Sequence, residues 1–561
     1  MKKFRFILAL VLVLTMVLST PLMAMAATHE AYGSDDIYNA FETDTDDEVI
    51  INMKNDIVMD YGDTLYGNEG QNYTINGNGN TLSDVVIDGA GNVAIDADIT
   101  SENNYAALIV GGEANVTVTG DVTGADGDAE YVDMENPMSG DSGALGVEAY
   151  DHATVKVEGD VTGGDGYGTT GHGGNGVTAY GGASVEVTGN VTGGDVIANP
   201  DVEASYYLGS DGEKYYSSSA GGDGVEVWDD ASVTVGGNVT GGSTNGDQGD
   251  GGIGVDADDY YSYGADDNVS ASVTVGGDVT GGDATNGVAG VGVYADNLSV
   301  VEVGGNVTGG DATSGFAAPG IYTENSTQIT VGGDVTGGTA TDGGESGAGI
   351  YAEYYGDYYE DNEEGIERGT VTVAGTVSGG EGAASIYFNA PESLAELVKE
   401  IEDLDLDAIL EKDPEELTED DYMALELALM ALISNGDLTE EELEAYGEEA
   451  DNINSFEEYI AFTQKVINAE KTQEIDLMDG FGEIGPEYSL ITVGSVSKEN
   501  GPAYGSNAGE KYAQAVADIY VEEVGIATPN TGDGFNPMLV LAVALVSLMG
   551  TAALVFKKKA A

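Results

Sequence analysis

The stretch Val155-Lys-Val-Glu-Gly-Asp-Val-Thr-Gly-Gly-Asp165 decides the fold of this chain. Its valines share one parity and most of its polar residues share the other, which predicts a strand with one apolar face and one solvated face. The pair Gly163-Gly164 then ends the strand and lets the backbone turn. Versions of this stretch recur along the chain, with the middle valine at 122, 161, 191, 239, 279, 307, 335 and 377.

A second, shorter motif of the form Gly-Val/Ile-X-Ala falls between the copies. The long motif repeats at spacings of 39, 30, 48, 40, 28, 28 and 42 residues, so the shortest period is 28 and the others carry insertions. Three short strands with their turns fit in such a period, whereas a four-stranded propeller blade needs about 40–45 residues. Short strands cannot bury their valines alone, so the pattern predicts a solenoid of stacked coils. The short motif reads Gly146-Val-Glu-Ala-Tyr150, Gly176-Val-Thr-Ala-Tyr180, Gly292-Val-Tyr-Ala-Asp296 and Gly349-Ile-Tyr-Ala-Glu353.

These coils resemble the right-handed parallel β-helix of the pectin-lyase-like architecture. The resemblance covers about residues 50–390, and Tyr73–Leu82 is similar to a coil common near the start of such proteins. It implies a mostly β solenoid. Ahead of it, Asp35–Phe41 favours a short amphipathic helix over the first coil, because an end coil exposes open strand edges. We therefore expect an N-terminal cap and parallel β-helix repeats over residues 27–390.

The composition changes over residues 391–475, where glycine nearly vanishes and Leu, Glu and Ala replace it. Leu394, Leu397, Val398 and Ile401 share a helical face. This predicts three to five helices in a small α-helical insertion near the C-terminal end of the rod. The insertion is either a partner-docking module or a cap on the last coil. Residues 476–527 are expected to supply the final strands, a closing helix or strand, and a tether.

The N-terminus has the three parts of an export signal. Lys2, Lys3 and Arg5 precede the apolar run Phe6–Leu18, and Ala24-Met25-Ala26 follows it. We predict a secretory signal peptide over residues 1–26, cleaved after Ala26. The chain has no cysteine, so an exported rod would have to be stabilised by its stacked coils without disulfides.

The C-terminal residues 528–561 have three parts. The first is the pentapeptide Thr528, Pro529, Asn530, Thr531 and Gly532. The apolar run Met538–Phe556 is long enough to span a bilayer, and Lys557, Lys558 and Lys559 follow it on the cytoplasmic side. Together they resemble the LPXTG-like sorting signal of Gram-positive wall-anchored proteins. The resemblance implies a sortase as partner and peptidoglycan as the final attachment, with membrane contact only through this helix before sorting. A tail-anchored protein is the alternative.

Carried over from that family, cleavage falls between Thr531 and Gly532, and Thr531 becomes linked to the cell wall. Thr528 stands where the family usually has Leu, which leaves open the class of sortase that reads the signal.

The charge of the chain excludes several classes of partner. The 101 acidic and 16 basic residues give a formal net charge of −85. Such a surface repels nucleic acid and anionic membranes, so we expect neither as a partner. It attracts cations, among which Ca²⁺ is the candidate outside a cell.

Tyrosine-rich insertions are the candidate binding loops. Their tyrosines stand among Gly, Ser, Asp and Glu, the mixture of rigid amphipathic and adaptable polar groups that binding loops favour. We expect them to contact an extracellular glycan or protein ligand, with solvated decoration loops as the alternative. The candidate residues are Tyr206, Tyr207, Tyr260, Tyr261, Tyr263, Tyr354, Tyr355, Tyr358 and Tyr359.

Aspartates after the Gly-Gly corner form the candidate metal row. Stacked coils would place them about 5 Å apart, where like charges repel and a bound Ca²⁺ would relieve the repulsion. Ser243 and Thr339 occupy this position in two copies and interrupt the row, so we favour solvated turn residues and keep calcium as the alternative. Gly251–Asp256 matches a calcium-binding nonapeptide once, and we reject it because calcium rolls need tandem copies. The row consists of Asp165, Asp195, Asp283 and Asp311.

The remaining question is whether the chain is an enzyme. Lyases that cleave acidic polysaccharide need cationic groups, and the solenoid offers only Lys54, Lys156, Lys214 and Arg368, far apart in sequence. Carboxylates are so numerous that no hydrolytic pair stands out, and we assign no catalytic residue. We expect an exported, wall-anchored scaffold or adhesin-like protein. The alternative is a polysaccharide-degrading hydrolase that uses Asp and Glu, for which a carboxylate cluster should converge in a groove.

Overall fold

The computed structural model of this chain describes most of residues 26–524. The predicted signal peptide, apart from Ala26, and the whole of residues 528–561 lie outside the described part. Described are 26–60, 62–102, 105–130, 140–198, 219–246, 248–258, 270–296, 298–324, 327–353, 369–391, 405–413, 416–434, 455–470 and 488–524, the backbone of 206–208 and 214–216, and the single residues Ala395, Tyr446 and Ile453.

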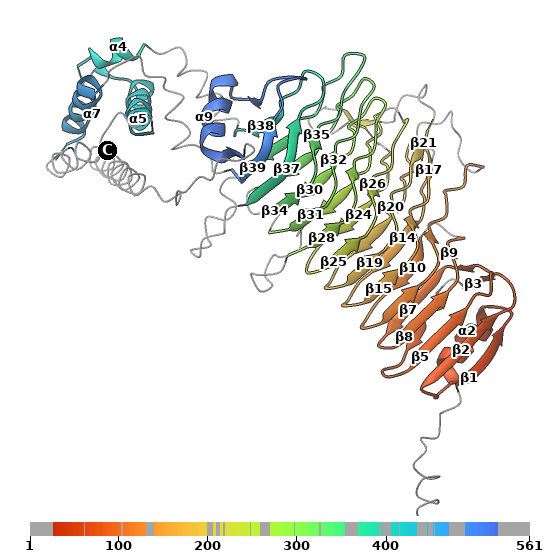
Figure 1. Ribbon diagram of the computed structural model, residues 1–561. Helices are drawn as coiled ribbons and strands as arrows, with labels where there is room; N and C mark the ends of the chain where they lie inside the picture. Colours follow the sequence, from red (N-terminus) through yellow and green to blue (C-terminus); the bar gives the residue numbers. More distant parts are fainter. Residues whose placement is uncertain are drawn as a thin grey trace, which may run out of the picture.

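The predicted fold class is confirmed, because the chain winds into a mostly β parallel solenoid (Figure 1). One coil contains a strand at Leu145–Ala149, a strand at Thr154–Val157 and a strand at Val161–Thr162. Each strand pairs in parallel with its counterpart in the next coil. The three positions of the coil therefore generate three faces of the rod, which we number faces 1, 2 and 3 in chain order.

Face 1 is a single sheet of 12 strands. Its strands are β4 (Leu65–Gly67), β7 (Val85–Gly89), β10 (Ala106–Val110), β14 (Leu145–Ala149), β18 (Val177–Ala179), β24 (Val225–Val227), β27 (Val255–Ala257), β30 (Val293–Ala295), β33 (Ile321–Thr323), β36 (Ile350–Glu353), β38 (Ile386–Asn389) and β40 (Tyr504–Ser506).

Face 2 contains the longer strands. They are β1 (Ala27–Ala31), β2 (Glu48–Met53), β5 (Asn72–Asn76), β8 (Asn92–Asp96), β11 (Asn115–Val118), β15 (Thr154–Val157), β19 (Ser184–Val187), β25 (Ser232–Val235), β28 (Ser272–Val275), β31 (Val300–Val303), β34 (Gln328–Val331), β37 (Thr370–Ser378), β39 (Leu490–Val496) and β41 (Val521–Glu523).

Face 3 contains the two-residue strands and the end of β37. They are β3 (Ile57–Val58), β6 (Leu82–Ser83), β9 (Ile99–Thr100), β12 (Val122–Thr123), β16 (Val161–Thr162), β20 (Val191–Thr192), β26 (Val239–Thr240), β29 (Val279–Thr280), β32 (Val307–Thr308) and β35 (Val335–Thr336). Outside the three faces lie β13 (Gly140–Asp141), β17 (Gly166–Gly168), β21 (Val196–Ile197), β22 (Tyr206–Leu208) and β23 (Lys214–Tyr216).

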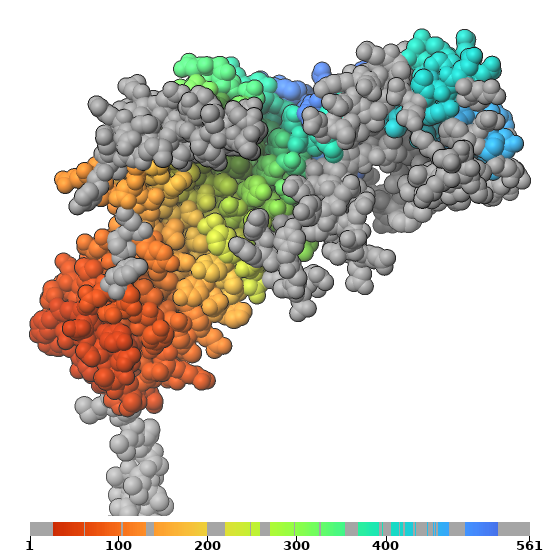
Figure 2. All heavy atoms as spheres, turned by 180° about the vertical axis from the view of Figure 1, so that it is seen from behind, coloured from red at the N-terminus to blue at the C-terminus, as the bar shows by residue number. Residues whose placement is uncertain are grey.

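The core of the rod is a column of valines from successive coils. In β15 the burial alternates, with Val155 and Val157 buried while Thr154 is exposed. Val155 lies directly opposite Val185 of the next coil, so each valine packs on its own counterpart. Burying one such side chain contributes about 1.5–3 kcal/mol, which explains how many short strands hold together. Figure 2 shows the coils from behind as successive colour bands along the rod.

The Gly-Gly corner needs glycine for steric reasons. A Cβ added at Gly194 would lie 1.9 Å from the carbonyl oxygen of Gly164 in the preceding coil. The same position in the next copy, Gly242, would meet the carbonyl oxygen of Gly194 at 1.9 Å. The corner thus brings the backbones of neighbouring coils too close for any side chain.

A helix covers the first coils, at the place where the sequence favoured one. Helix α2 (Ser34–Thr43) buries Ile37, Ala40 and Phe41. The Phe41 ring stacks on Tyr73 of β5 at a centroid distance of 4.0 Å. The preceding strand β1 was not expected from the polar residues 27–50, and it adds one more parallel strand beyond β2.

Helix α9 (Glu510–Tyr520) closes the other end of the rod. It buries Tyr512, Val516 and Tyr520, and the chain then re-enters face 2 as β41. The insertion contains α4 (Leu406–Leu410), α5 (Glu419–Ser434) and α7 (Phe456–Glu470) in its described part. In Figure 1 these three helices lie beyond α9, away from the coils. The cover on the last described coil is therefore α9.

Candidate functional site

Most of the candidate binding tyrosines lie outside the described residues. Only Tyr206 and Tyr207 fall on a described strand, β22, which pairs antiparallel with β23 through the backbone. The wall-sorting residues Thr528–Gly532 also lie outside the described part. Both assignments therefore remain predictions. The tyrosines outside are Tyr260, Tyr261, Tyr263, Tyr354, Tyr355, Tyr358 and Tyr359.

The predicted aspartate row exists, and its side chains bind backbone. The backbone N–H of Asp195 donates to Asp165 Oδ1 at 2.9 Å, and that of Ser243 donates to Asp195 Oδ1 at 2.7 Å. Ser243 continues the row, because its Oγ accepts from the N–H of Asp283 at 3.1 Å. Asp283 and Asp311 accept in the same way from the next coil. The row thus links coils through hydrogen bonds to the backbone, and calcium at these four residues stays an untested prediction.

Face 1 carries a column of candidate functional side chains that the sequence did not single out. The middle residue X of each Gly-Val/Ile-X-Ala copy lies opposite the middle residue of the next copy. The first half of this column, which we call the X column, is polar and acidic, and the second half is aromatic. In order along the rod the column reads Glu148, Thr178, Glu226, Asp256, Tyr294, Tyr322, Tyr351 and Tyr387.

The tyrosines of the X column form one continuous stack. The ring centroids are 4.9 Å apart between Tyr294 and Tyr322, 5.3 Å between Tyr322 and Tyr351, and 5.2 Å between Tyr351 and Tyr387. These spacings follow the distance between parallel strands. A phenol is already neutral at physiological pH, and burial raises the pKa of all four phenols further above that range.

A second column stands two residues after the X column in each coil. Its order along the rod is the reverse, with aromatic residues first and acids second. It begins with aromatic residues: the Tyr150 and Tyr180 rings stack at 5.7 Å, and Tyr180 lies 5.5 Å from the ring of Trp228. It continues with four acids, which stand two residues after Asp256, Tyr294, Tyr322 and Tyr351 of the X column. The two columns bond to each other, as in the hydrogen bond from the Tyr322 hydroxyl to Glu353. The acids of this second column are Asp258, Asp296, Glu324 and Glu353.

The acidic part of the X column converges on one point. Asp223, just before β24, Glu226 on β24 and Asp256 on β27 each place a carboxylate oxygen within 4.8 Å of the other two. Burial raises the pKa of Asp223 to about 7 and raises the pKa of Glu226 and Asp256 as well. The charges of Asp223 and Glu226 raise the pKa of Asp256 further. This acid triad therefore resists carrying three negative charges at once.

The triad is held by neighbouring polar groups. Glu226 Oε2 accepts from Asn175 Nδ2 at 2.7 Å and from the Thr178 hydroxyl at 3.2 Å. Asp223 Oδ1 accepts from the backbone N–H of Ile253 at 2.7 Å. Within the described residues, no Lys, Arg or His forms an ion pair with any of the three acids. Hydrogen bonds thus fix two of the three carboxylates, those of Asp223 and Glu226, without neutralising them.

Glycosidases hold two carboxyl groups at defined separations, whereas the triad gathers three carboxylates at one point. Inverting glycosidases separate their two carboxyl groups by about 6.5–9.5 Å to admit a water, and retaining ones by about 5–5.5 Å. In the triad, oxygens of three carboxylates lie within 4.8 Å of each other. Such closeness suits the sharing of a proton or of a cation between the acids.

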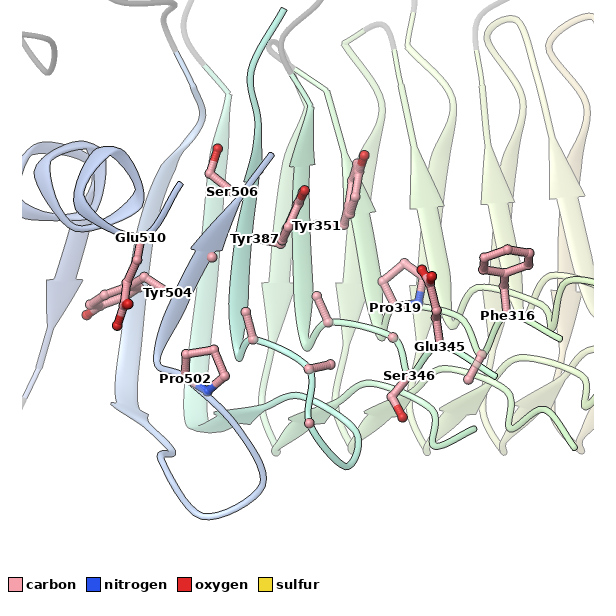
Figure 3. A pocket seen from close by; sticks show the side chains of 17 residues that line it. Phe316, Pro319, Glu345, Ser346, Tyr351, Tyr387, Pro502, Tyr504, Ser506 and Glu510 are labelled. Atoms are coloured by element: carbon pink, nitrogen blue, oxygen red, sulfur yellow. The ribbon is translucent and has the colours of Figure 1, made fainter. Parts of the chain in front are cut away.

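An open groove lies along face 1 at its C-terminal end, with a volume of about 650 Å³ (Figure 3). Its apolar lining comes from Phe316, Pro319, Pro502 and the tyrosines at positions 351, 387 and 504. The Phe316 side chain is 54% exposed. The polar lining consists of Glu345, Ser346, Ser506 and Glu510. Ligand-binding sites are commonly lined by aromatic surfaces with a few hydrogen-bond acceptors and hydroxyl groups beside them.

A signal for these sites was present in the sequence. Gly224-Val-Glu-Val227 and Gly254-Val-Asp-Ala257 are further copies of the short motif, and aligning them would have placed Glu226 beside Asp256. The insertions that make the spacings uneven hide this alignment. Asp223 gives no such signal, because it joins the triad only through the shape of the corner.

Comparison of the chain with known proteins adds no family. Neither the protein-family models, nor the curated proteins, nor the solved structures give a match. Within the described residues there is no helix with the length and apolar character needed to cross a membrane, and the predicted span Met538–Phe556 lies outside them. The fold and the candidate sites of this chain therefore have to be argued from its own residues.

Proposed function

We propose that this chain is an exported, wall-anchored surface protein that binds an extended, uncharged or basic glycan along face 1. The groove at the C-terminal coils carries the proposal. It offers the Phe316 side chain and the Tyr351 and Tyr387 rings beside Glu345 and Glu510. Sugar rings stack on aromatic side chains, and carboxylates accept hydrogen bonds from sugar hydroxyls.

The charge of the chain narrows the class of glycan. With a formal net charge of −85, the protein repels uronic-acid or sulfated polymers by long-range electrostatics. Neutral polymers are tolerated, and amino sugars with free amines are attracted. A rod with a repeating face also matches a repeating ligand, since the strand spacing of about 4.8 Å recurs from coil to coil.

A glycan-array screen with a matched pair of variants tests the proposal. Phe316→Ala removes an exposed ring from the groove. Val288→Ala is the control, because Val288 lies opposite Phe316 in the preceding coil, is 48% exposed, and does not line the groove. We expect Phe316→Ala to weaken glycan binding about tenfold and Val288→Ala to leave it unchanged. Equal effects, or no glycan bound by the parent protein, would exclude the groove as the binding site.

A polysaccharide hydrolase on the same fold is the second candidate function. The observation that favours it is the convergence of Asp223, Glu226 and Asp256 on one face. A reducing-sugar assay run with every glycan that binds distinguishes the two functions. Sugar release that is abolished by Asp256→Asn would replace the scaffold proposal with the enzyme. No release, with binding intact, is the outcome that the scaffold predicts.

Anchoring has its own test. In cells of the source organism, fragments released from the wall by a muramidase should contain a C-terminal peptide that ends at Thr531 and is linked to a peptidoglycan stem. Thr531→Ala should shift the protein to the membrane or the medium. Recovery of residues 533–561 in the wall-linked protein would contradict the sortase mechanism.

A further inference from the structure

The acid triad unites two adjacent coils at one point on face 1. Strands β24 and β27 are paired so that Glu226 lies opposite Asp256. Asp223 reaches the same point from the corner before β24, where its Oδ1 also accepts the backbone N–H of Ile253 in the next coil. One carboxylate oxygen from each residue lies within 4.8 Å of the others.

One carboxylate oxygen of the triad is buried and has no hydrogen-bond partner among the described residues. Asp256 Oδ1 is inaccessible to solvent and has no hydrogen-bond partner. A buried carboxylate oxygen without a donor costs free energy, and protein structures rarely keep one without a ligand or an ordered water. Within the described residues, the hydrogen bonds of Asp223 and Glu226 use only one oxygen of each, so the triad retains acceptors for a further group.

The surroundings add negative charge to the triad. Asp258 and Asp296 lie near enough to raise the pKa of Asp256, and no ion pair with Lys, Arg or His relieves the three acids within the described residues. A buried group of like charges is relieved either by shared protons or by a cation. The triad is acidic and made only of oxygen ligands, so the cation would be a hard one rather than zinc.

The coordination chemistry of the triad favours calcium over magnesium. Magnesium demands near-ideal octahedral geometry and usually keeps several waters, so it is seldom held by a cage of protein carboxylates alone. Calcium accepts irregular sets of carboxylate and carbonyl oxygens at about 2.3–2.6 Å. Three carboxylates with oxygens within 4.8 Å of one another can reach one such ion together.

We propose that Asp223, Glu226 and Asp256 bind one calcium ion that clamps two adjacent coils of the rod. This site is separate from the Asp165 row, whose carboxylates accept backbone N–H groups. It is also independent of the glycan groove, which is lined by residues from position 316 onward. Asp256 falls in the single nonapeptide match, but its partners come from the neighbouring coil and not from a tandem repeat.

Terbium luminescence gives a direct test on the mature chain. Trp228 is the only tryptophan and stands two residues after Glu226, so light absorbed by it can sensitise Tb³⁺ bound at the triad. In 150 mM KCl, which screens the general negative field, we expect one saturable Tb³⁺ site. Calcium should displace the ion at concentrations at least tenfold lower than magnesium.

Two variants identify the residues. Asp256→Asn keeps the shape of the side chain and should weaken calcium binding at least tenfold, and Asp195→Asn in the corner row should not change it. Calcium should also raise the thermal midpoint of the parent protein and of Asp195→Asn, but not of Asp256→Asn.

Three outcomes would overturn the site. They are the absence of a saturable ion in the parent protein, binding that survives in Asp256→Asn, and binding that is lost in Asp195→Asn. Because the first outcome needs no variant, the proposal stays testable even if Asp256→Asn fails to fold. Loss of the ion leaves the glycan test unaffected, so the two proposals fail separately.

Discussion

The carboxylate of Asp195 accepts a hydrogen bond of 2.7 Å from the backbone N–H of Ser243, 48 residues later in the chain. This bond belongs to a row in which each corner side chain binds the backbone of the next coil. A parallel row precedes face 3, where Asp160 Oδ1 accepts from the N–H of Asn190 and Asn190 Oδ1 from that of Asn238. Polar corners of the rod are therefore bonded from coil to coil, as its strands are.

Removing one hydrogen bond of this row should lower the free energy of unfolding by a measurable amount. Asp195→Ala leaves the Ser243 N–H without its acceptor, and we expect a loss of about 1 kcal/mol in the free energy of unfolding. Asp195→Asn retains an oxygen acceptor and should lose less than half as much. Urea unfolding followed by circular dichroism measures both. Equal losses in the two variants would mean that the charge of Asp195, and not the hydrogen bond, carries the effect.

A side chain at the Gly-Gly corner should destabilise the rod more than the loss of a hydrogen bond. In Gly282→Ala the new methyl group would lie 1.9 Å from the carbonyl oxygen of Gly242, so the coils have to separate. We expect a cost of about 1–3 kcal/mol from overpacking, read from the same urea curves. Glu302→Ala, at an exposed strand position, is the control and should stay within about 0.5 kcal/mol. A neutral Gly282→Ala would contradict the close approach of the corners.

The second column on face 1 should make stability depend on pH. Burial, together with the charges of Asp296, Glu353 and Asp258, raises the pKa of Glu324 to about 8. A carboxyl group whose pKa is raised in the folded state stabilises the protein below its unfolded value, and this contribution is lost as pH rises through the folded value. Without added cations, the thermal midpoint should therefore fall between about pH 5 and pH 8.

Glu324→Gln tests this assignment, because a neutral amide cannot ionise. The fall of the thermal midpoint with pH should become shallower in this variant and stay unchanged in Glu302→Gln, whose side chain is exposed. Other acids with raised pKa values, among them Asp223, Glu226 and Asp256, act in the same direction, so the slope should shrink without vanishing. An unaltered slope would remove Glu324 from the explanation.

The C-terminal cover should depend on one buried tyrosine. Tyr488 is fully buried, its ring packs on Phe388 and Tyr520 at 5.2 and 5.8 Å, and its hydroxyl donates to the carbonyl of Asn389 at 3.1 Å. Tyr488→Ala should cost about 3–5 kcal/mol and Tyr488→Phe about 1 kcal/mol.

Because each coil contacts mainly its neighbours, the loss should be local. Hydrogen exchange should show α9 and β41 opening first in Tyr488→Ala, while the amides of β25 and β28 keep their protection. Uniform loss of protection along the rod would instead show that the coils unfold together.

The strands of faces 2 and 3 were predictable because the pattern that defines them lies within a few consecutive residues. Val155 and Val157 alternate with polar residues, and that period alone assigns them to the interior. The Gly-Gly pairs likewise mark corners, since a residue with a side chain would collide there with the backbone of the neighbouring coil. Helix α2 followed from the need to cover an open end of the stack.

The sites were less predictable because they depend on which coils become neighbours. Ser243 looked like a break in the aspartate row, yet a hydroxyl serves as acceptor as well as a carboxylate does. Glu226 and Asp256 are 30 residues apart and meet only once β24 and β27 are in register. Asp223 lies at a corner whose path no periodicity describes. Strand β1 was missed because its sequence, Ala27–Ala31, is too polar and too short to show the alternation that predicts a strand.

The equal spacing of the shortest coils has a consequence for how such a rod changes over generations. Ser272, Val300 and Gln328 stand at the same register position in three successive coils, 28 residues apart. Excising residues 300–327 would bring Gln328 opposite Ser272 and Tyr351 opposite Tyr294, so the strand register would be kept. Each such excision or duplication shifts the length by about 4.8 Å. The length of the rod therefore changes over generations in steps of one whole coil.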